Sequence, residues 1–188
     1  RLRQREELYQ IAPKLSAVAY LSEIEEPYTL GYGQCLKIMV DHTQTVWPGF
    51  SANESLVCNK NRRMLAETKA YLKELEEETP GDYIIFPMQS GRRFAGYSIE
   101  EAQIEVEKFG HWALPTWIVG HHLITNPQRF PIKGSLVCDN LGDEMQGVKY
   151  LERYLCFTFC QLPSLITCGN PNCRKSNHGS LSGFHRSR

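Results

Sequence analysis

The amino-acid sequence predicts an α+β fold: a single mixed domain with N-terminal helices, a small sheet and a C-terminal extension that contains cysteine and histidine. Some segments carry apolar residues at helical spacing, and others are short runs of β-branched and aromatic residues bounded by turn signals. These segments do not alternate regularly, which argues against a doubly wound sheet. With 188 residues, 41% of them apolar and 22% charged, the chain suits one domain with a substantial core.

The N-terminal part has the pattern of a broken helix. We expect helix over residues 2–26, divided at Pro13, because proline lacks a backbone donor. Its second half carries apolar residues on one face, at Leu15, Val18, Leu21 and Ile24. Residues 28–42 are expected to be more extended, and residues 47–53 to form a loop.

The middle of the chain predicts a helix followed by a strand. The helix covers residues 61–79, and its apolar stripe is Leu65, Tyr71, Leu72 and Leu75. Pro80 and Gly81 then end it. Residues 82–88, DYIIFPM, predict a short buried strand because β-branched and aromatic side chains predominate.

Two further helices follow. Ser98 and Glu101 have capping-box spacing, and Gly110 is placed to end that helix. Its expected inward face is Ile99, Ala102, Val106 and Phe109. Thr116–Thr125 is the second helix, and strands are expected over 134–139 and 153–162, before a flexible tail from Gly179. We divide the chain into a core domain, residues 1–155, and a C-terminal part, residues 156–188, with a strand, a zinc knuckle and a basic tail.

Charge and cysteine content narrow the possible environments. Lys and Arg together equal Asp and Glu, 21 of each, so no global field steers the chain to nucleic acid. No apolar run has the length of a membrane helix, and we expect no membrane contact. Seven cysteines without a signal-peptide pattern indicate a reduced intracellular protein, in the cytoplasm, rather than a disulfide framework.

A metal site is predicted near the C-terminus. Cys168, Cys173 and His178 are spaced as C-x4-C-x4-H around turn-forming residues, and thiolate with imidazole is a ligand set that selects zinc. A closed site needs a fourth ligand, and we expect Cys160 or Cys156. If these two lie on one strand, they are about 13 Å apart and only one can bind. The alternative is a turn with two buried thiols and an exposed histidine.

The same segment resembles the zinc loop of some HNH-type homing nucleases. The resemblance covers about a dozen residues and is carried by Cys168, Asn170, Pro171, Cys173 and His178. In those proteins a C-x4-C-x4-H segment braces the metal-binding core. The resemblance implies metal binding at this segment.

A catalytic alternative uses two other segments. The Gly-His-His triplet ending at His121 and His122 is similar to one in certain HNH-like toxins, which implies a histidine general base beside a metal. Asp139, Asp143 and Glu144 offer oxygen ligands for a hard cation. A metal-dependent nuclease or other hydrolase requires both segments to converge in one cleft. Neighbouring helical residues point about 100° apart, so the alternative for the two histidines is that one is packed and the other exposed. The alternative for the acidic segment is an ordinary polar loop.

Local basic groups suggest contact with nucleic acid. Arg174 and Lys175 follow the knuckle, while Arg92 and Arg93 lie near aromatic residues. Arginine and lysine neutralise phosphates, and exposed aromatic rings stack on unpaired bases. A third basic group comprises Lys60, Arg62 and Arg63. Alternatively, each basic group is an ordinary solvated surface without a binding role.

Three classes of function follow from these observations. The main prediction is a non-catalytic binding module, zinc-stabilised, that contacts nucleic acid or a protein partner. The second is the metal-dependent hydrolase. The third is a structural assembly subunit without metal, which predicts an apolar surface patch, first of all in HWALPTW, residues 111–117. Walker A, G-x-G-x-x-G, G-x-S-x-G and H-E-x-x-H motifs are absent from the sequence, which disfavours the chemistries they serve.

Overall fold

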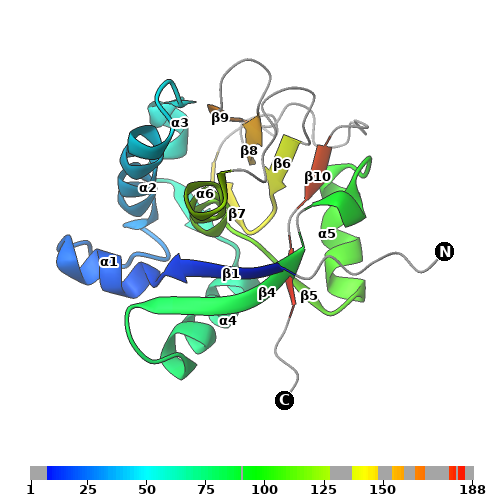
Figure 1. The fold of residues 1–188 in the computed structure, drawn as a ribbon, viewed down its shortest axis with the longest axis horizontal. Coiled ribbons are helices and arrows are strands. Elements are labelled where there is room, and N and C mark those ends of the chain that lie inside the picture. Colours follow the sequence, from blue (N-terminus) through cyan, green and yellow to red (C-terminus); the bar gives the residue numbers. More distant parts are fainter. Residues whose placement is uncertain are drawn as a thin grey trace.

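The computed structural model describes residues 8–89, 91–127, 137–147, 154–158, 164–167, 178–180 and 182–184. Helices and several small sheets are mixed along the chain, which confirms the α+β class (Figure 1). The helices are α1 (Leu15–Leu21), α2 (Tyr32–Val46), α3 (Glu54–Val57), α4 (Ala66–Glu78), α5 (Ile99–Lys108) and α6 (Thr116–Thr125), with a 3-10 turn η1 (Arg92–Phe94). The strands are β1 (Leu8–Pro13), β2 (Ser51–Ala52), β3 (Arg62–Met64), β4 (Tyr83–Gln89), β5 (His111–Ala113), β6 (Val137–Asn140), β7 (Asp143–Met145), β8 (Leu155–Thr158), β9 (Ser164–Thr167), β10 (His178–Ser180) and β11 (Ser182–Phe184).

The strands form two larger sheets and one two-stranded ribbon. The first sheet has the order β1-β4-β11-β5, and all its pairs are antiparallel. The second has the order β10-β6-β8-β9-β2 and mixes parallel with antiparallel pairs, while β3 and β7 form the ribbon. The C-terminal strands β10 and β11 join different sheets, and β11 lies between β4 and β5. The expected boundary after Leu155 therefore falls inside the paired strand β8.

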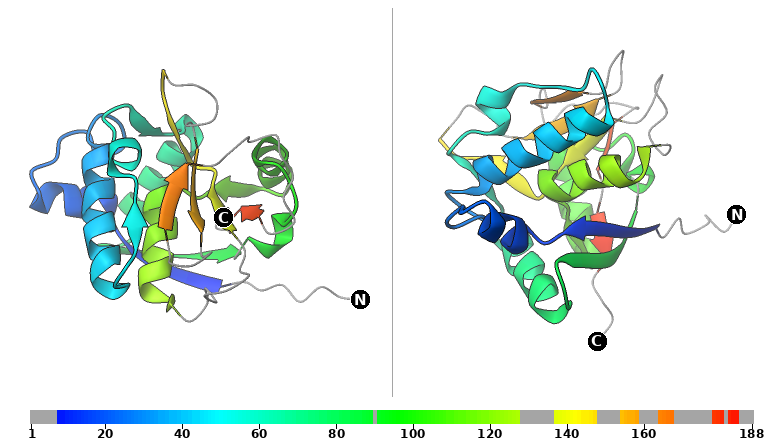
Figure 2. Two further views of the ribbon diagram at one scale, coloured as in Figure 1. Left: turned by 90° about the horizontal axis from the view of Figure 1, so that it is seen from above. Right: turned by 60° about the vertical axis from the view of Figure 1, so that its left-hand side comes forward.

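The main core forms where α2 and α6 lie side by side, as both views of Figure 2 show. The helices approach closely at Gly120, where an added Cβ would lie 2.1 Å from the Met39 sulfur. Trp117 on α6 is only 1% exposed and donates its indole N–H to the Pro13 carbonyl at 3.1 Å. This contact joins α6 to the end of β1.

The start of α1 is held by a carboxylate from another helix. Its own N-cap residue, Lys14, makes no side-chain capping bond. Glu76 of α4, 5% exposed, instead accepts the backbone N–H groups of Leu15 at 2.8 Å and Ser16 at 3.2 Å. It also accepts the Ser16 and Tyr28 hydroxyls, the latter at 2.6 Å. Glu76 thus supplies a cap that the α1 sequence lacks.

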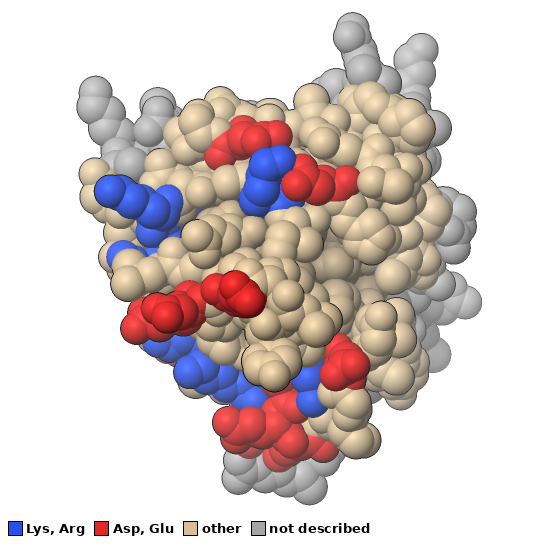
Figure 3. Space-filling view, turned by 90° about the vertical axis from the view of Figure 1, so that its left-hand side faces the viewer, with Lys and Arg blue, Asp and Glu red and all other residues tan. Residues whose placement is uncertain are grey.

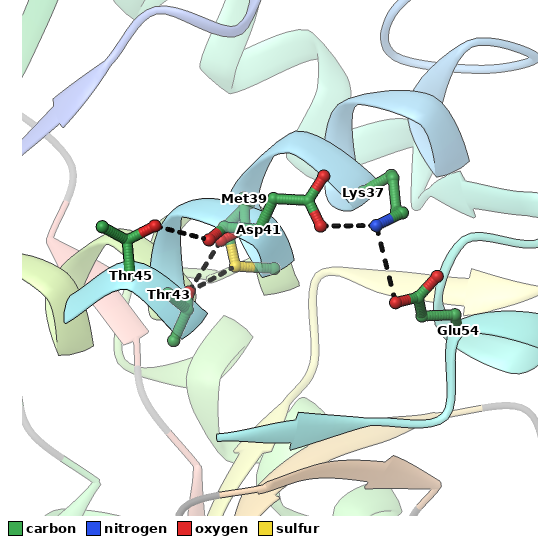
Figure 4. A network of polar contacts seen from close by, with 6 residues as sticks. All are labelled: Lys37, Met39, Asp41, Thr43, Thr45 and Glu54. Atoms are coloured by element: carbon green, nitrogen blue, oxygen red, sulfur yellow. Dashed lines mark hydrogen bonds and ion pairs between the residues drawn. The ribbon is translucent and has the colours of Figure 1, made fainter. Parts of the chain in front are cut away.

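The exposed side of α2 is polar and of mixed charge. Lys37 bonds Asp41 one turn along and lies 3.5 Å from Glu54 of α3, and exposed Thr45 donates to the Asp41 carbonyl (Figure 4). Thr43, on the buried side of the helix, donates to the Met39 carbonyl. Figure 3 shows Lys and Arg interspersed with Asp and Glu on the face that carries α1 and α2. This face therefore offers no continuous basic surface.

Several predicted elements are confirmed within the described residues. They are the second half of the N-terminal helix, the helix after residue 65, the two helices of residues 98–125, and strands at 83–89, 137–140 and 155–158. The strand of residues 83–89, expected to be buried, instead alternates between buried and exposed side chains. Ser98 and Glu101 form the complete capping box, and Gly110 follows the helix at φ 64°. These elements depend on short-range signals.

The backbone assignment was wrong in four places. Residues 8–13 form strand β1 rather than helix, because Gln10 and Ala12 face the core while Tyr9 and Ile11 alternate outward. Residues 32–46 form helix α2 rather than an extended segment. Residues 62–64 pair with β7 instead of opening a helix. In the tail expected to be flexible, residues 182–184 pair between two strands.

Side-chain placement also corrects three expectations. Trp112, Leu114 and Trp117 are 4%, 0% and 1% exposed, so HWALPTW is core rather than a surface patch. Arg62, expected in a basic patch, is fully buried. Phe109, expected to face inward, is 50% exposed. Within the described part of the chain, no helix is both long and apolar enough to span a membrane.

Candidate functional site

The predicted zinc knuckle lies largely outside the described residues, which leave out Cys160, Cys168 and Cys173. His178 opens β10, with its side chain outside the description, and Cys156 is buried in β8. Between them, β6 pairs Asp139 with both Cys156 and Ser180. Two strand spacings and two residues therefore separate Cys156 from His178, roughly 12 Å between Cα atoms. This spacing is long for two ligands of one zinc ion, while Cys160 lies outside the described residues.

The described cysteines have the character of structural thiols. Cys35, Cys58 and Cys156 are free. Burial raises the pKa of Cys35 to about 12 and that of Cys58 to about 11. Both stay protonated at neutral pH and are poor nucleophiles. Among the described residues, no group of three or more His, Cys, Asp or Glu is placed to hold a metal ion.

Asp143, a predicted acidic site residue, caps helix α6. The N-cap residue Pro115 offers no side-chain bond. Asp143 reaches from β7 and accepts the Thr116 backbone N–H at 2.6 Å and the Thr116 hydroxyl at 3.0 Å. Asn140 donates to the same hydroxyl at 3.1 Å. The carboxylate is thereby committed to the start of the helix.

Burial dominates the electrostatics of this cap. It raises the pKa of Asp143 to about 6, while the charge of buried Arg62 and the Thr116 hydrogen bonds limit the rise. Burial also raises the pKa of Tyr32, whose hydroxyl accepts the Trp117 backbone N–H at 3.3 Å. These hydrogen bonds give the buried polar groups at the start of α6 partners inside the protein.

The two predicted histidines face different neighbours. His121 is 5% exposed, and its ring meets Trp117 edge-on, with 4.4 Å between centroids. Burial, and then the nearby His42, lowers the pKa of His121 to about 3. His122 is 1% exposed and bonds Gln10 of β1 through Nδ1. Neither contact involves the acidic segment.

The acidic segment is itself divided. Asp143 contacts the first residue of α6, about 7.5 Å along the axis before His121. Glu144 is partly exposed and lies opposite Arg63 in the ribbon. Asp139 lies on β6, and its side chain is outside the description. The contacts of the described groups thus run to separate partners, and the hydrolase remains a prediction.

The predicted basic groups are only partly described. Arg174 and Lys175 lie outside the described residues, as does the side chain of Arg92. The Arg93 guanidinium lies 3.8 Å from the centre of the Phe109 ring, a cation–π contact. The described part of this patch is therefore an arginine already placed on an aromatic face.

A groove between α4, α5 and the edge of β5 is a concave site among the described residues. Its volume is about 570 Å³, within the range of small-molecule sites. Its lining residues are Leu65, Ala66, Glu67, Thr68, Tyr71, Gln103, Val106, Glu107, Gly110, His111, Trp112, Ala113 and Tyr154. Thr68 fixes one wall by donating to the Ala113 carbonyl at 3.1 Å.

Sequence reasoning did not identify this groove. Glu67 stands in the first turn of α4 and Glu107 near the end of α5. Each has the appearance of a solvated charge, and nothing in their separation along the chain links them. Only the packing of both helices beside β5 brings the two carboxylates to one site.

The outer face of β1 and β4 is a second candidate surface, which we call the β1/β4 face. Cross-strand pairing places Tyr9 opposite Pro87, Ile11 opposite Ile85, and Pro13 opposite Tyr83. The large side chains are exposed: Tyr9 by 76%, Tyr83 by 56%, Ile85 by 50% and Ile11 by 43%. All these positions are uncharged, so strand alternation gathers apolar surface on one side.

No protein-family model matches the chain, and no curated protein or solved structure shows significant similarity to it.

Proposed function

We propose that this chain is a non-catalytic binding module that uses the β1/β4 face to bind a protein partner, and that this partner is a second copy of the chain. The observation that carries the proposal is the set of exposed, uncharged side chains on this face, led by Tyr9 and Tyr83. The largest exposed apolar patch of a typical monomer, about 300–600 Å², is often functional.

The exposed area fits a small symmetric interface. With roughly 200 Å² for each large side chain, the exposed fractions give about 450 Å² per copy. Two copies would bury about 900 Å², and the flanking prolines bring the total near 1,000 Å², the lower limit of specific interfaces. We therefore expect a dimer that dissociates at micromolar concentrations.

The chemistry of the face favours a second copy over nucleic acid. A two-fold interface places the same surface against itself, and a face without charge meets no like-charge repulsion there. Nucleic acid requires accessible cations. No residue of the β1/β4 face is basic; of the basic residues predicted for nucleic-acid contact, Arg62 is buried, and Arg93 is exposed with its guanidinium over the Phe109 ring.

Zinc remains part of this proposal as a stabiliser of the C-terminal segment. The donor set of Cys168, Cys173 and His178 supports it, with Cys160 or Cys156 as fourth ligand. Elemental analysis of the purified protein tests it beside a Cys168→Ser/Cys173→Ser variant. About one zinc per chain, lost in the variant, is the expected result; protein purified without chelator that carries no metal contradicts it.

Sedimentation velocity tests the β1/β4 face, over loading concentrations from about 5 µM to about 500 µM. We expect the weight-average mass to rise toward the dimer, and Tyr9→Ser/Tyr83→Ser to weaken association at least about tenfold. The matched control is Leu30→Ser/Ile104→Thr, which removes side chains of similar exposure elsewhere. A chain that stays monomeric throughout, or a dimer that the tyrosine variant leaves unchanged, refutes the proposal.

A further inference from the structure

We infer that the groove between α4, α5 and β5 is a binding site for an organic cation, a guanidinium or ammonium group presented by an arginine or lysine side chain. This inference goes beyond the proposed self-association and concerns a different surface. It combines three features of the groove: its charge, its aromatic surface and its size.

The charge of the groove is negative and uncompensated. Glu67 on α4 and Glu107 on α5 are exposed, and neither carboxylate forms an ion pair or hydrogen bond with a described residue. No Lys or Arg is among the lining residues. Lys108, next to Glu107, is instead paired with Glu105 at 2.6 Å. Two carboxylates facing one groove without a cation attract a positively charged ligand and repel an anionic one.

The apolar part of the groove suits a flat or alkyl-bearing cation. Tyr71 is the partly exposed ring of the lining, and Trp112, 5.0 Å from it, and Tyr154 also line the groove but are only 4% and 5% exposed. Aromatic faces attract guanidinium and ammonium groups, and guanidinium also stacks on them. Val106 and the aliphatic part of Gln103 offer contact for the stem of the side chain.

The remaining polar groups leave this preference unchanged. His111 in the groove wall is 7% exposed, and its Nδ1 lies 2.9 Å from the Ser182 hydroxyl. The Thr68 hydroxyl is bonded to β5. The volume of about 570 Å³ admits an arginine-sized side chain with adjoining backbone.

Titration of the full chain with blocked amino acids, followed by amide NMR shifts, tests the inference. The probes are Nα-acetyl-arginine amide and Nα-acetyl-lysine amide. Nα-acetyl-citrulline amide is the neutral control, because its urea group matches guanidinium in shape without the charge. We expect arginine to bind at least about tenfold more tightly than citrulline, with shifts at Glu107, Gly110 and Trp112. Tighter binding of arginine or of lysine identifies the preferred cation, and both results support the site.

Charge-neutralising variants locate the binding. Glu67→Gln and Glu107→Gln are each expected to weaken arginine binding about three- to tenfold. Glu100→Gln, an exposed carboxylate on the same helix α5 outside the groove, is expected to leave it unchanged. Equal binding of citrulline, unchanged affinity in both groove variants, or no shifts at up to about 10 mM probe overturns the inference. Sedimentation velocity tests the β1/β4 face and the NMR titration tests the groove, so the two proposals can fail independently.

Discussion

Replacing Glu76 by alanine removes the cap of helix α1 and is expected to destabilise the fold more than any neighbouring charge. The carboxylate is 5% exposed and accepts four hydrogen bonds, two from backbone N–H groups and two from hydroxyls. Ser16 is exposed, so water replaces the lost acceptor there. The Leu15 N–H and the Tyr28 hydroxyl are buried and lose their partner.

The magnitude follows from those two buried donors. Hydrogen bonds to a charged group contribute about 1.5–3 kcal/mol each, and an orphaned buried donor costs a similar amount. We therefore expect Glu76→Ala to lower the free energy of unfolding by about 3–5 kcal/mol. Glu76→Gln keeps one oxygen acceptor but places an amide N–H₂ near donors, so its loss is expected to fall between wild type and alanine.

Urea unfolding followed by circular dichroism measures the effect. The matched control is Glu77→Ala, the next residue on α4, which is exposed and is expected to change the free energy of unfolding by less than about 0.5 kcal/mol. A Glu76→Ala protein within about 1 kcal/mol of wild type would show that this carboxylate does not hold α1.

Three further substitutions test the core around α6. Burial lowers the pKa of His121 to about 3, so below about pH 6.5 the unfolded state binds a proton that the folded state does not. The free energy of unfolding therefore falls as pH falls, by up to roughly 1.4 kcal/mol per pH unit. In urea unfolding from pH 6.5 to 4, we expect the free energy of unfolding of His121→Phe to rise relative to that of wild type. Burial raises the pKa of Asp143 from an ordinary 3.8 to about 6, so between these values the folded state binds a proton that the unfolded state does not. The free energy of unfolding therefore falls as pH rises to 6, and we expect that of Asp143→Asn to rise relative to wild type from pH 4 to 6. A pH-independent difference contradicts either assignment. Gly120→Ala should destabilise by about 1–3 kcal/mol in thermal unfolding, because the new Cβ meets Met39; an unchanged melting temperature contradicts the close approach.

The sequence predicted those elements whose signals are local. The capping box of Ser98 and Glu101 and the glycine at 110 define both ends of α5 within a dozen residues. Strand β1 was missed because its pattern of Tyr9, Gln10, Ile11 and Ala12 gains meaning only when β4 pairs with it. A buried glutamine in that alternation bonds His122, more than a hundred residues away.

Helix α2 was missed for a different reason. Its glycines at 31 and 33 are typical of turns, yet both stand where backbone packs closely. A Cβ at Gly33 would lie 2.6 Å from the carbonyl oxygens of Cys58 and Asn59. Close packing, rather than turn geometry, is the reason for glycine there. The distinction depends on tertiary contacts that the residue type alone does not reveal.

The structural use of acidic residues distinguishes Glu76 and Asp143 from the two carboxylates of the groove. α1 and α6 both begin without a capping side chain of their own, and each is capped by a distant carboxylate, Glu76 or Asp143. Both of these carboxylates are buried against the helix starts that they cap, and their oxygens accept hydrogen bonds from residues there. Glu67 and Glu107 carry no such duty and remain exposed on one groove. In this fold, a carboxylate without a structural partner is therefore a better indicator of a ligand site than an acidic residue beside a histidine in the sequence.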